Sequence, residues 1–254
     1  MSVYTHKKIS QHMTAIADPG NVMFFLIEGA SGALVIDTGY GVLNPREYVE
    51  SLTDRSYEVI CTHAHGDHIM GMKHFDWAYL PSDDFEILEM GNYDKAFKDK
   101  FRVLPEKSFD LGGVSVVCLT LAGHTPGIVG ILVEEDRVIM LGDACNTHTW
   151  MFLDKALPIA EFKQNLEDFK ANHQHKFDQV FVSHNQLGKA HSPEILDECI
   201  EVCELILSGN DAKIPYTYNN FDGEKIKVAM PTDKNGNRDD GKAANIMYHV
   251  DRLR

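Results

Sequence analysis

Hydrophobic residues in this chain gather in short runs that are rich in β-branched and aromatic residues and are bounded by glycine, proline and polar residues. This pattern is typical of buried strands. It predicts strands over 21–29, 32–41, 57–62, 77–81, 114–123, 127–135, 136–144 and 177–185. Only the turn sequence Gly-Ala-Ser-Gly separates the first two runs, which predicts a hairpin.

Between these runs, apolar residues recur at helical spacing or follow helix-starting residues. We expect helices over 44–52, 67–75, 82–100, 158–172 and 192–209. Asn44 is placed to cap the first helix, with Pro45 at its first position, while Ser192 and Gly209 bound the last. The order of strands and helices predicts an α/β protein in which two sheets pack between helix layers.

The C-terminal segment has its own pattern. Residues 218–231 predict a β-hairpin, 232–242 a polar loop and 244–250 a last strand. We found no linker or repeat, so we expect a single domain over 1–254, with 210–254 as a C-terminal β-hairpin extension. The extension is expected either to cover a pocket or to form a dimer contact in a homo-oligomer.

Composition narrows the class of protein. The 254 residues are 44% hydrophobic, enough for a sizeable core. A formal charge of −14, from 24 basic and 38 acidic residues, disfavours a nucleic-acid partner because phosphate binding depends on Lys and Arg. No apolar run approaches the ~18 residues of a membrane span, and MSVYTHKKIS has no signal-peptide core. We therefore expect a cytoplasmic protein with no membrane partner.

The five cysteines are scattered and odd in number, which is typical of reduced thiols rather than of a disulfide framework. Cys199 and Cys203 stand one helical turn apart, a spacing that would also suit a redox or metal pair. Within the apolar sequence EILDECIEVCELIL we expect them to line the buried face of a helix.

The sequence THAHGDHIMG, residues 62–71, concentrates imidazole and carboxylate groups in one loop. His63 and His65 lie two apart at a strand end, so an extended backbone points both side chains the same way. Asp67 and His68 are adjacent at a helix start and cannot both point with that pair. The spacing predicts two neighbouring ion sites, and such a ligand set suits Zn²⁺ or a comparable divalent ion.

Three more potential ligands each follow a buried strand. His124 stands in GHTPG, Asp143 in LGDA, and His184 after VFVS. In an open α/β sheet, the loops that follow the strands commonly hold the catalytic and binding side chains. Any one of these residues alone is a weak signal, but together with the first cluster they predict one site.

These motifs resemble the metallo-β-lactamase-fold hydrolase superfamily over about residues 20–190, and GHTPG is similar to the glyoxalase II/lactonase-like branch. The resemblance implies a four-layer αββα sandwich of the metallo-β-lactamase type. It implies one metal on His63, His65 and His124, and a second on Asp67, His68 and His184, with Asp143 bridging them. Asp37, in VIDTG, matches a buried aspartate that supports the ligands from behind.

A binuclear centre of this kind implies a metallohydrolase. Two divalent ions, Zn²⁺ being favoured and Fe or Mn compatible, would hold a bridging hydroxide as the nucleophile. Asp67 would orient that hydroxide as the catalytic residue. The expected reaction is cleavage of an ester, thioester, lactone or related carbonyl bond in a small-molecule substrate.

Other activities stay open at this point. A mononuclear iron persulfide-dioxygenase-like oxidoreductase would use His63, His124 and Asp143, but it would leave Asp67, His68 and His184 without a metal to bind. A phosphodiesterase is a second alternative, although members of that kind are longer and more basic. The diiron flavoproteins of this fold commonly have a glutamate at the position of His65, so this residue favours the hydrolase branch. The tail also departs from glyoxalase II, because it is neither helical nor basic.

The loop 144–157 follows a predicted ligand and is expected to contribute to the substrate pocket. Its candidates for substrate binding are Asn146, Thr149, Trp150 and Phe152, the two aromatic residues being equally compatible with plain packing. The sequence leaves open whether His148 and Cys145 contribute to the site.

Overall fold

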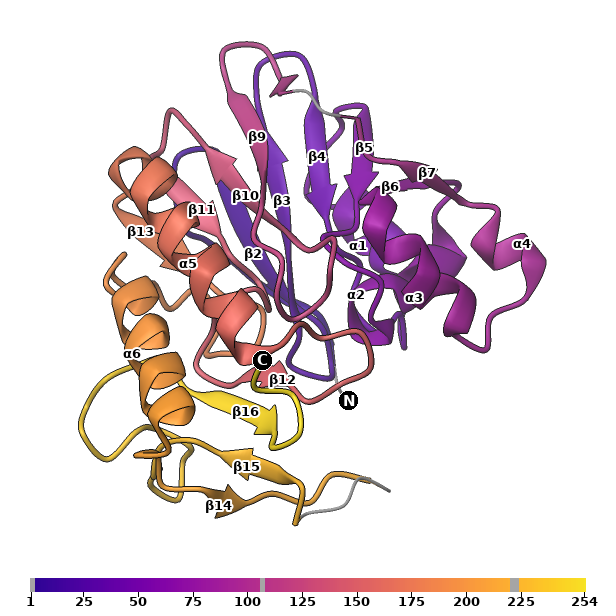
Figure 1. The fold of residues 1–254 in the computed structure, drawn as a ribbon. Helices are drawn as coiled ribbons and strands as arrows, with labels where there is room; N and C mark the ends of the chain where they lie inside the picture. The colour runs from indigo at the N-terminus through magenta and orange to yellow at the C-terminus, as the bar shows by residue number, and fades with distance from the viewer. Residues whose placement is uncertain (1–2, 106–107, 220–223) are drawn as a thin grey trace.

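Two β-sheets pack face to face in this protein, and helices cover the outer face of each (Figure 1). The computed structural model describes residues 3–105, 108–219 and 224–254. The predicted α/β class and αββα layering are therefore confirmed. In the part of the chain that the structure describes, no helix is long and apolar enough to cross a membrane.

The first sheet has seven strands in the order of the sequence. Strands β1 to β4 are antiparallel neighbours, and β4 to β7 run parallel. Its strands are β1 (Thr5–Lys8), β2 (Met13–Ala17), β3 (Met23–Glu28), β4 (Ala33–Ile36), β5 (Tyr57–Ile60), β6 (Ala78–Leu80) and β7 (Phe101–Val103). The predicted β3–β4 hairpin is confirmed.

The second sheet has five strands in the order β13-β11-β10-β9-β8. All neighbours are antiparallel except β11 and β13, which run parallel. Its strands are β8 (Phe109–Asp110), β9 (Ser115–Thr120), β10 (Val129–Val133), β11 (Val138–Met140) and β13 (Gln179–Phe181).

The helices divide between the two outer faces. The first sheet is covered by α1 (Pro45–Glu50), α2 (Gly66–Ile69), α3 (Phe85–Met90) and α4 (Lys95–Lys98), with the 3₁₀ turns η1 (Met70–His74) and η2 (Ser82–Asp84). The second sheet is covered by α5 (Ile159–His173) and α6 (Ile195–Ser208), with the 3₁₀ turn η3 (Gln174–Lys176) after α5.

Alternation along β3 shows how the layers hold together. Met23, Phe25 and Ile27 point between the two sheets, whereas Phe24 and Leu26 pack under the helices of the first sheet. A strand buried on both faces needs apolar residues at every position, which explains why its sequence is continuously hydrophobic.

A third, smaller sheet joins the C-terminal segment to the main body, in the order β12-β16-β15-β14 (Figure 1). Its strands are β12 (Thr149–Met151), β14 (Ile214–Pro215), β15 (Ile226–Val228) and β16 (Ile246–His249). Strand β15 lies within the predicted hairpin and β16 within the predicted last strand, but β14, the antiparallel partner of β15, lies before residue 218, where the predicted hairpin begins. Residues 220–223 of the predicted hairpin lie outside the described residues.

Several predicted boundaries are wrong. The expected helix over 82–100 is interrupted after Met90, where Gly91 takes an extended conformation. The N-cap of the last helix is Glu194, two residues after the expected Ser192. Gly209 follows the end of the helix as predicted, in the left-handed conformation. Strands β1, β7, β8, β12 and β14 were not predicted, because short or edge strands carry little apolar signal. Strand β2 was also not predicted, because alanine and threonine make up most of its sequence, MTAIA.

The predicted role of the helical cysteines is confirmed. Cys199 and Cys203 are fully buried on α6 in the apolar cluster shared with α5. All five cysteines are free thiols.

The double-sided burial of β3 makes its residues sensitive to truncation. We expect Phe25→Ala to lower the free energy of unfolding by about 3–5 kcal/mol, because it leaves a cavity between two sheets. Urea denaturation measures the change. Val103→Ala, at a position that is 58% exposed, is the matched control and should change stability by less than about 0.5 kcal/mol. Equal effects of the two variants would contradict the inter-sheet placement of Phe25.

Candidate metal centre

The predicted ligands meet at one edge of the paired sheets, where four strands end. His63, His65, Asp67 and His68 follow β5, and Asp143 follows β11. His124 lies in the β9–β10 connection, and His184 follows β13. The structure thus brings all seven side chains together, in two groups.

The first group consists of His63, His65 and His124, whose possible ligand atoms all lie within 4.8 Å of one another. His65 Nδ1 stands 2.8 Å from His124 Nε2. His63 Nε2 is buried and has no hydrogen-bond partner among the described residues. A buried nitrogen without a partner is costly, and here it faces two further imidazoles.

The second group consists of Asp67, His68, Asp143 and His184, again within 4.8 Å of one another. His184 Nε2 lies 3.1 Å from Asp143 Oδ2 and 3.3 Å from Asp67 Oδ2. His68 Nε2 lies 3.3 Å from Asp143 Oδ2 and 3.5 Å from Asp67 Oδ2. Two imidazoles and two carboxylates therefore face a common centre.

Asp143 stands between the two groups. Its Oδ2 atom, besides facing His68 and His184, lies 3.6 Å from His124 Nε2 of the first group. Asn146 Nδ2 donates to Asp143 Oδ1 at 3.3 Å, which holds the carboxylate from the side. One oxygen thus faces nitrogens from both groups.

Asp37 orients the histidines from behind. Its fully buried carboxylate accepts hydrogen bonds from Thr62 N at 2.7 Å, from Thr62 Oγ1 and from His68 Nδ1 at 2.9 Å. Because the Thr62 hydroxyl donates to Asp37, it accepts from His63 Nδ1 at 3.1 Å. Both imidazoles are thereby held with Nδ1 protonated and Nε2 turned to the cluster.

His124 is oriented in the same way by a backbone group. Its Nδ1 donates to the carbonyl oxygen of Trp150 at 2.8 Å, which leaves Nε2 free toward His65 and Asp143. The carbonyl comes from β12, so the small third sheet helps to position this histidine.

Asp84 is a supporting residue that the sequence reasoning missed. Its buried carboxylate accepts from Ala64 N at 2.8 Å, from Thr125 Oγ1 at 3.0 Å and from Gly127 N at 2.8 Å. It ties the loop of His63 and His65 to the loop of His124. The available signal was an aspartate shortly after the short strand β6, a placement similar to that of Asp143 after β11.

The two groups differ in charge. Burial and the neighbouring imidazoles lower the pKa of His63 well below its usual value and lower the pKa of His65 to about 3. Burial acts in the same direction on His68 and His184, but the carboxylates of the second group outweigh it. They raise the pKa of His68 well above its usual value and that of His184 to about 10. The first group is therefore neutral, whereas the second pairs protons with ionised carboxylates.

The donor chemistry of both groups fits divalent cations. Neutral imidazoles with free nitrogen lone pairs suit zinc, and a cation would replace the protons that hold the second group together. Zinc–nitrogen bonds of about 2.0–2.1 Å in a tetrahedron set neighbouring ligand atoms roughly 3.3 Å apart. The second group already shows separations of 3.1–3.5 Å.

Comparison with known proteins agrees with this geometry. The sequence model of the metallo-beta-lactamase superfamily matches residues 17–182, more than half of the chain. The chain belongs to the metallo-β-lactamase superfamily. The expected membership is confirmed, while the glyoxalase II/lactonase-like branch stays a prediction.

One relative is similar to this chain over about two thirds of its length. The uncharacterized protein sll0514 from Synechocystis is 30% identical over 192 residues, which make up 67% of this chain and 34% of that protein. The chain therefore spans about a third of the length of that relative.

Two solved structures illustrate the common fold. The metallo-β-lactamase from Pontibacter korlensis has a TM-score of 0.65 at 15% identity and covers 80% of this chain and 99% of its own. FIM-1 from Pseudomonas aeruginosa, in a mono-zinc form, has a TM-score of 0.62 at 16% identity. The match covers 79% of this chain and 95% of FIM-1. At such identities, the likeness shows the fold alone.

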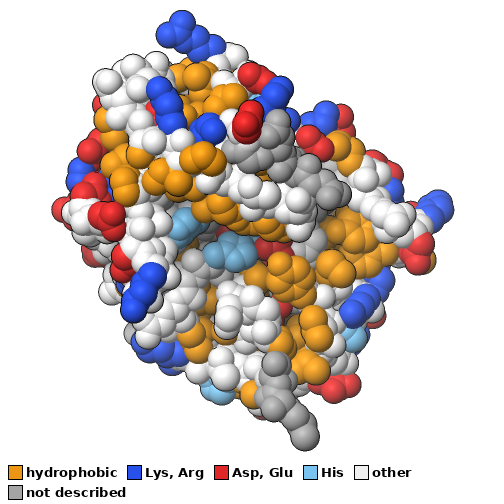
Figure 2. Space-filling model, turned by 90° about the horizontal axis from the view of Figure 1, so that it is seen from below, with side chains coloured by type: hydrophobic (Ala, Val, Ile, Leu, Met, Phe, Trp, Pro, Cys, Tyr) orange, Lys and Arg blue, Asp and Glu red, His pale blue; other side chains and the backbone are white. Residues whose placement is uncertain are grey.

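In this member of the superfamily, the two groups lie at a cavity of about 670 Å³. Figure 2 shows histidines in a hollow bordered by hydrophobic side chains. Residues of the two groups that line the cavity are His65, Asp67, His124, Asp143 and His184, and its walls include Tyr40, Trp150, Leu153, Tyr216, Tyr218 and Met247. The described lining contains no Lys or Arg.

Only half of the predicted substrate-binding residues line this cavity. Asn146 and Trp150 do, whereas Thr149 and Phe152 are fully buried behind the wall. The hydroxyl of Thr149 accepts a hydrogen bond from Asn146 N at 3.0 Å. Phe152 packs against Trp150 with ring centroids 5.1 Å apart, so it supports the wall without reaching the cavity.

The sequence left open whether His148 and Cys145 contribute to the site, and the structure places these two residues differently. His148 lines the cavity, and burial lowers the pKa of its imidazole, which keeps it neutral. Cys145 is fully buried in the apolar core, with its thiol 3.7 Å from the carbonyl oxygen of Ile195. Cys145 therefore points away from the metal centre.

The sequence reasoning also missed several wall residues. Tyr216, Tyr218 and Met247 come from the C-terminal segment, and Tyr40 comes from the loop after Asp37. The aromatic sequence YTY before the predicted hairpin was the one available signal. The expectation that the tail covers the pocket as an edge hairpin agrees with this placement.

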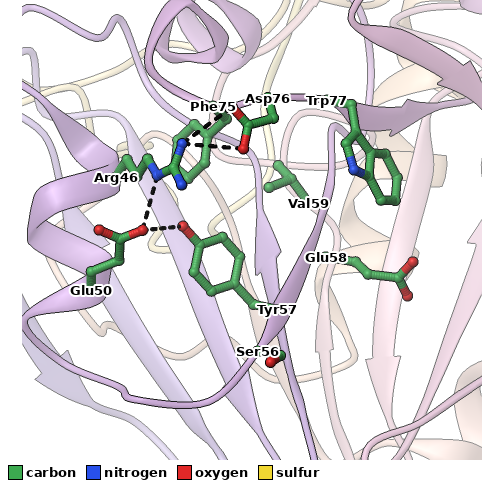
Figure 3. A pocket seen from close by; sticks show the side chains of 9 residues that line it. All are labelled: Arg46, Glu50, Ser56, Tyr57, Glu58, Val59, Phe75, Asp76 and Trp77. Atoms are coloured by element: carbon green, nitrogen blue, oxygen red, sulfur yellow. Dashed lines mark hydrogen bonds and ion pairs between the residues drawn. The ribbon is translucent and has the colours of Figure 1, made fainter.

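A second hollow, of about 250 Å³, lies at the β5–β6 edge and shares no lining residue with the metal-centre cavity (Figure 3). Arg46 pairs there with Glu50 at 2.9 Å and with Asp76 at 3.3 Å, and Tyr57 donates to Glu50 at 3.1 Å. Since these charges already pair with one another, the hollow offers a ligand no free charge from them.

The contacts of Asp37 generate a prediction about metal affinity. Asp37→Asn removes the charge that holds His68 and, through Thr62, His63, so we expect zinc affinity to fall about 10–100-fold. Competition with a chromophoric chelator measures the affinity. Asp76→Asn, at an exposed carboxylate, is the control and should leave it unchanged. Unchanged zinc affinity in a folded Asp37→Asn protein would rule out this supporting role.

Proposed function

We propose that this protein is a binuclear metallohydrolase that cleaves an ester, thioester, lactone or related carbonyl bond of a small molecule. The observation that carries the proposal is the sharing of Asp143 between two adjacent groups of ligand atoms at one cavity. Hydrolysis adds water across the acyl bond and releases a carboxylic acid and an alcohol or thiol.

The grouping of the side chains supports the following assignment of residues. His63, His65 and His124 would hold one ion, Asp67, His68 and His184 the other, and Asp143 would serve both. When bound, two such ions polarise the carbonyl oxygen and lower the pKa of a shared water. Zinc is proposed because the ligands are mainly imidazoles, with iron and manganese as the alternatives.

Asp67 is the proposed catalytic residue. It belongs to the second group but also lines the cavity, whereas His68 is buried beneath it. Its carboxylate can accept a proton from the attacking water and orient that water toward the substrate carbonyl.

The walls favour a carbonyl substrate over a phosphodiester. A phosphodiester is anionic, and the described cavity lining offers no Lys or Arg to bind it. Trp150, Tyr40 and Tyr218 instead offer aromatic surface for an acyl or aryl group. The iron dioxygenase alternative is less well supported, because it leaves Asp67, His68 and His184 without a metal to hold.

Metal removal and the Asp67→Asn variant test the hydrolase. We expect dialysis against EDTA to abolish hydrolysis of the best substrate in a panel of esters, thioesters and lactones, and Zn²⁺ to restore it. In the zinc-loaded Asp67→Asn variant, kcat should fall at least about 100-fold. Asp54→Asn, at an exposed position, is the matched control.

Metal analysis by mass spectrometry accompanies these assays, on protein purified without a metal-binding tag. About two zinc ions per chain support the proposal. One iron per chain, with oxygen consumption on thiol substrates and no hydrolysis, would replace it with the oxidative alternative. Full activity in Asp67→Asn would refute the catalytic role of Asp67.

The aromatic wall generates a prediction about acyl preference. Trp150→Ala keeps the backbone carbonyl that orients His124 but removes the indole from the cavity. We expect KM for benzoyl esters to rise about tenfold, with little change for acetyl esters, because only the larger group contacts the ring. Steady-state kinetics measure both, and Trp77→Ala is the control. A parallel rise for both esters would show that the indole does not select the acyl group.

A further inference from the structure

A trough with a polar lining lies next to the metal-centre cavity. The trough, of about 710 Å³, lies between the loop 184–191 and the loop 233–243. His148 and His184 line both the trough and the cavity, so the two spaces meet beside the metal centre. A substrate whose reacting bond lies at the centre can therefore extend into both.

The two spaces differ in polarity. The cavity has aromatic and apolar side chains in its walls, whereas the trough is lined by amides, cationic residues and histidines, with few apolar residues. Its amides include Gln186 and Asn237, and its cationic residues are Lys189, Arg238 and Lys242. In a chain of formal charge −14, this grouping of positive side chains stands out.

Most of this positive charge is already neutralised. Arg238 is buried, donates from Nε to Asp240 Oδ1 at 2.9 Å and from Nη1 to the carbonyl oxygen of Ala244 at 2.6 Å. Lys242 pairs with Glu201. Arg238 and Lys242 therefore form part of the trough wall, and their charges are paired within the protein.

Lys189 differs from them. Its side chain is exposed and has no ion-pair partner among the residues that the structure describes. Gln186, one turn earlier in the same loop, is also exposed, and its backbone carbonyl accepts from Lys189 N at 3.0 Å. The trough thus presents one unpaired ammonium group beside an amide side chain that can donate and accept hydrogen bonds.

We propose that the substrate is bipartite, with an aromatic or apolar acyl group in the cavity and an anionic, hydrogen-bonding leaving group in the trough, bound by Lys189. The inference rests on the proposed hydrolase and names its substrate class, an acyl ester or thioester whose alcohol or thiol carries a carboxylate or a phosphate. Lys189 determines specificity without touching the reacting bond.

Binding of ligands that cannot be hydrolysed tests the proposal. One matched pair is N-acetyl-S-benzylcysteinylglycine and its C-terminal amide. The other is S-benzylpantetheine 4′-phosphate and S-benzylpantetheine. Isothermal titration of the zinc-loaded protein gives Kd for each. We expect the anionic member of one pair to bind about fivefold more tightly than its neutral partner, and the pair identifies the anion as carboxylate or phosphate.

Variants attribute the preference to Lys189. Lys189→Ala should make the two members of that pair bind equally, and Lys189→Glu should favour the neutral member. Lys73→Ala, at an exposed lysine outside the trough, is the matched control and should keep the native ratio.

Three results would overturn the inference: no binding of any of the four ligands, equal binding within both pairs, or a preference that survives Lys189→Ala. Its failure is distinct from failure of the proposed function. A protein that hydrolyses simple acyl esters but shows no preference for anions loses only the bipartite substrate. A protein with the preference but no hydrolysis loses only the reaction.

Discussion

One buried carboxylate holds much of the candidate metal centre in place. Asp37 is fully enclosed and accepts hydrogen bonds from the amide and hydroxyl of Thr62 and from His68. A charge in such a place is stable only while these donors satisfy it. The parallel pairing of β4 and β5 brings Asp37 and Thr62 to the same sheet edge. Sheet register, histidine orientation and ligand geometry are therefore linked through this one group.

Asp84 performs a similar task for the other side of the centre. Its partners Ala64, Thr125 and Gly127 belong to two loops that carry ligands from different sheets. Because each carboxylate bonds to backbone amides as well as side chains, groups of the protein itself fix the loops relative to each other. Such preorganisation lowers the conformational cost of assembling a charged site.

Residues next to long apolar runs were predictable. The ligands after β5, β11 and β13 and the supporting Asp37 all follow strands whose hydrophobicity is evident in the sequence. Asp84 was missed because its partners lie 20 to 43 residues away. Strand β12 has three residues and pairs with β16, almost a hundred positions later. The sequence therefore carried no sign of this strand, and Thr149 was expected to lie in a loop and to face a pocket. Such contacts depend on tertiary pairing, which local pattern does not encode.

The third sheet joins the part of the chain that matches the superfamily model to the part that follows it. The superfamily match ends at residue 182, yet Tyr216, Tyr218 and Met247 beyond it form part of the cavity wall. Most of the ligands therefore belong to the shared fold, while much of the surface that would select a substrate belongs to the appended strands. If the proposed hydrolysis is correct, exchanging residues 210–254 for another tail would change which substrates fit the cavity while leaving the seven predicted ligands in place.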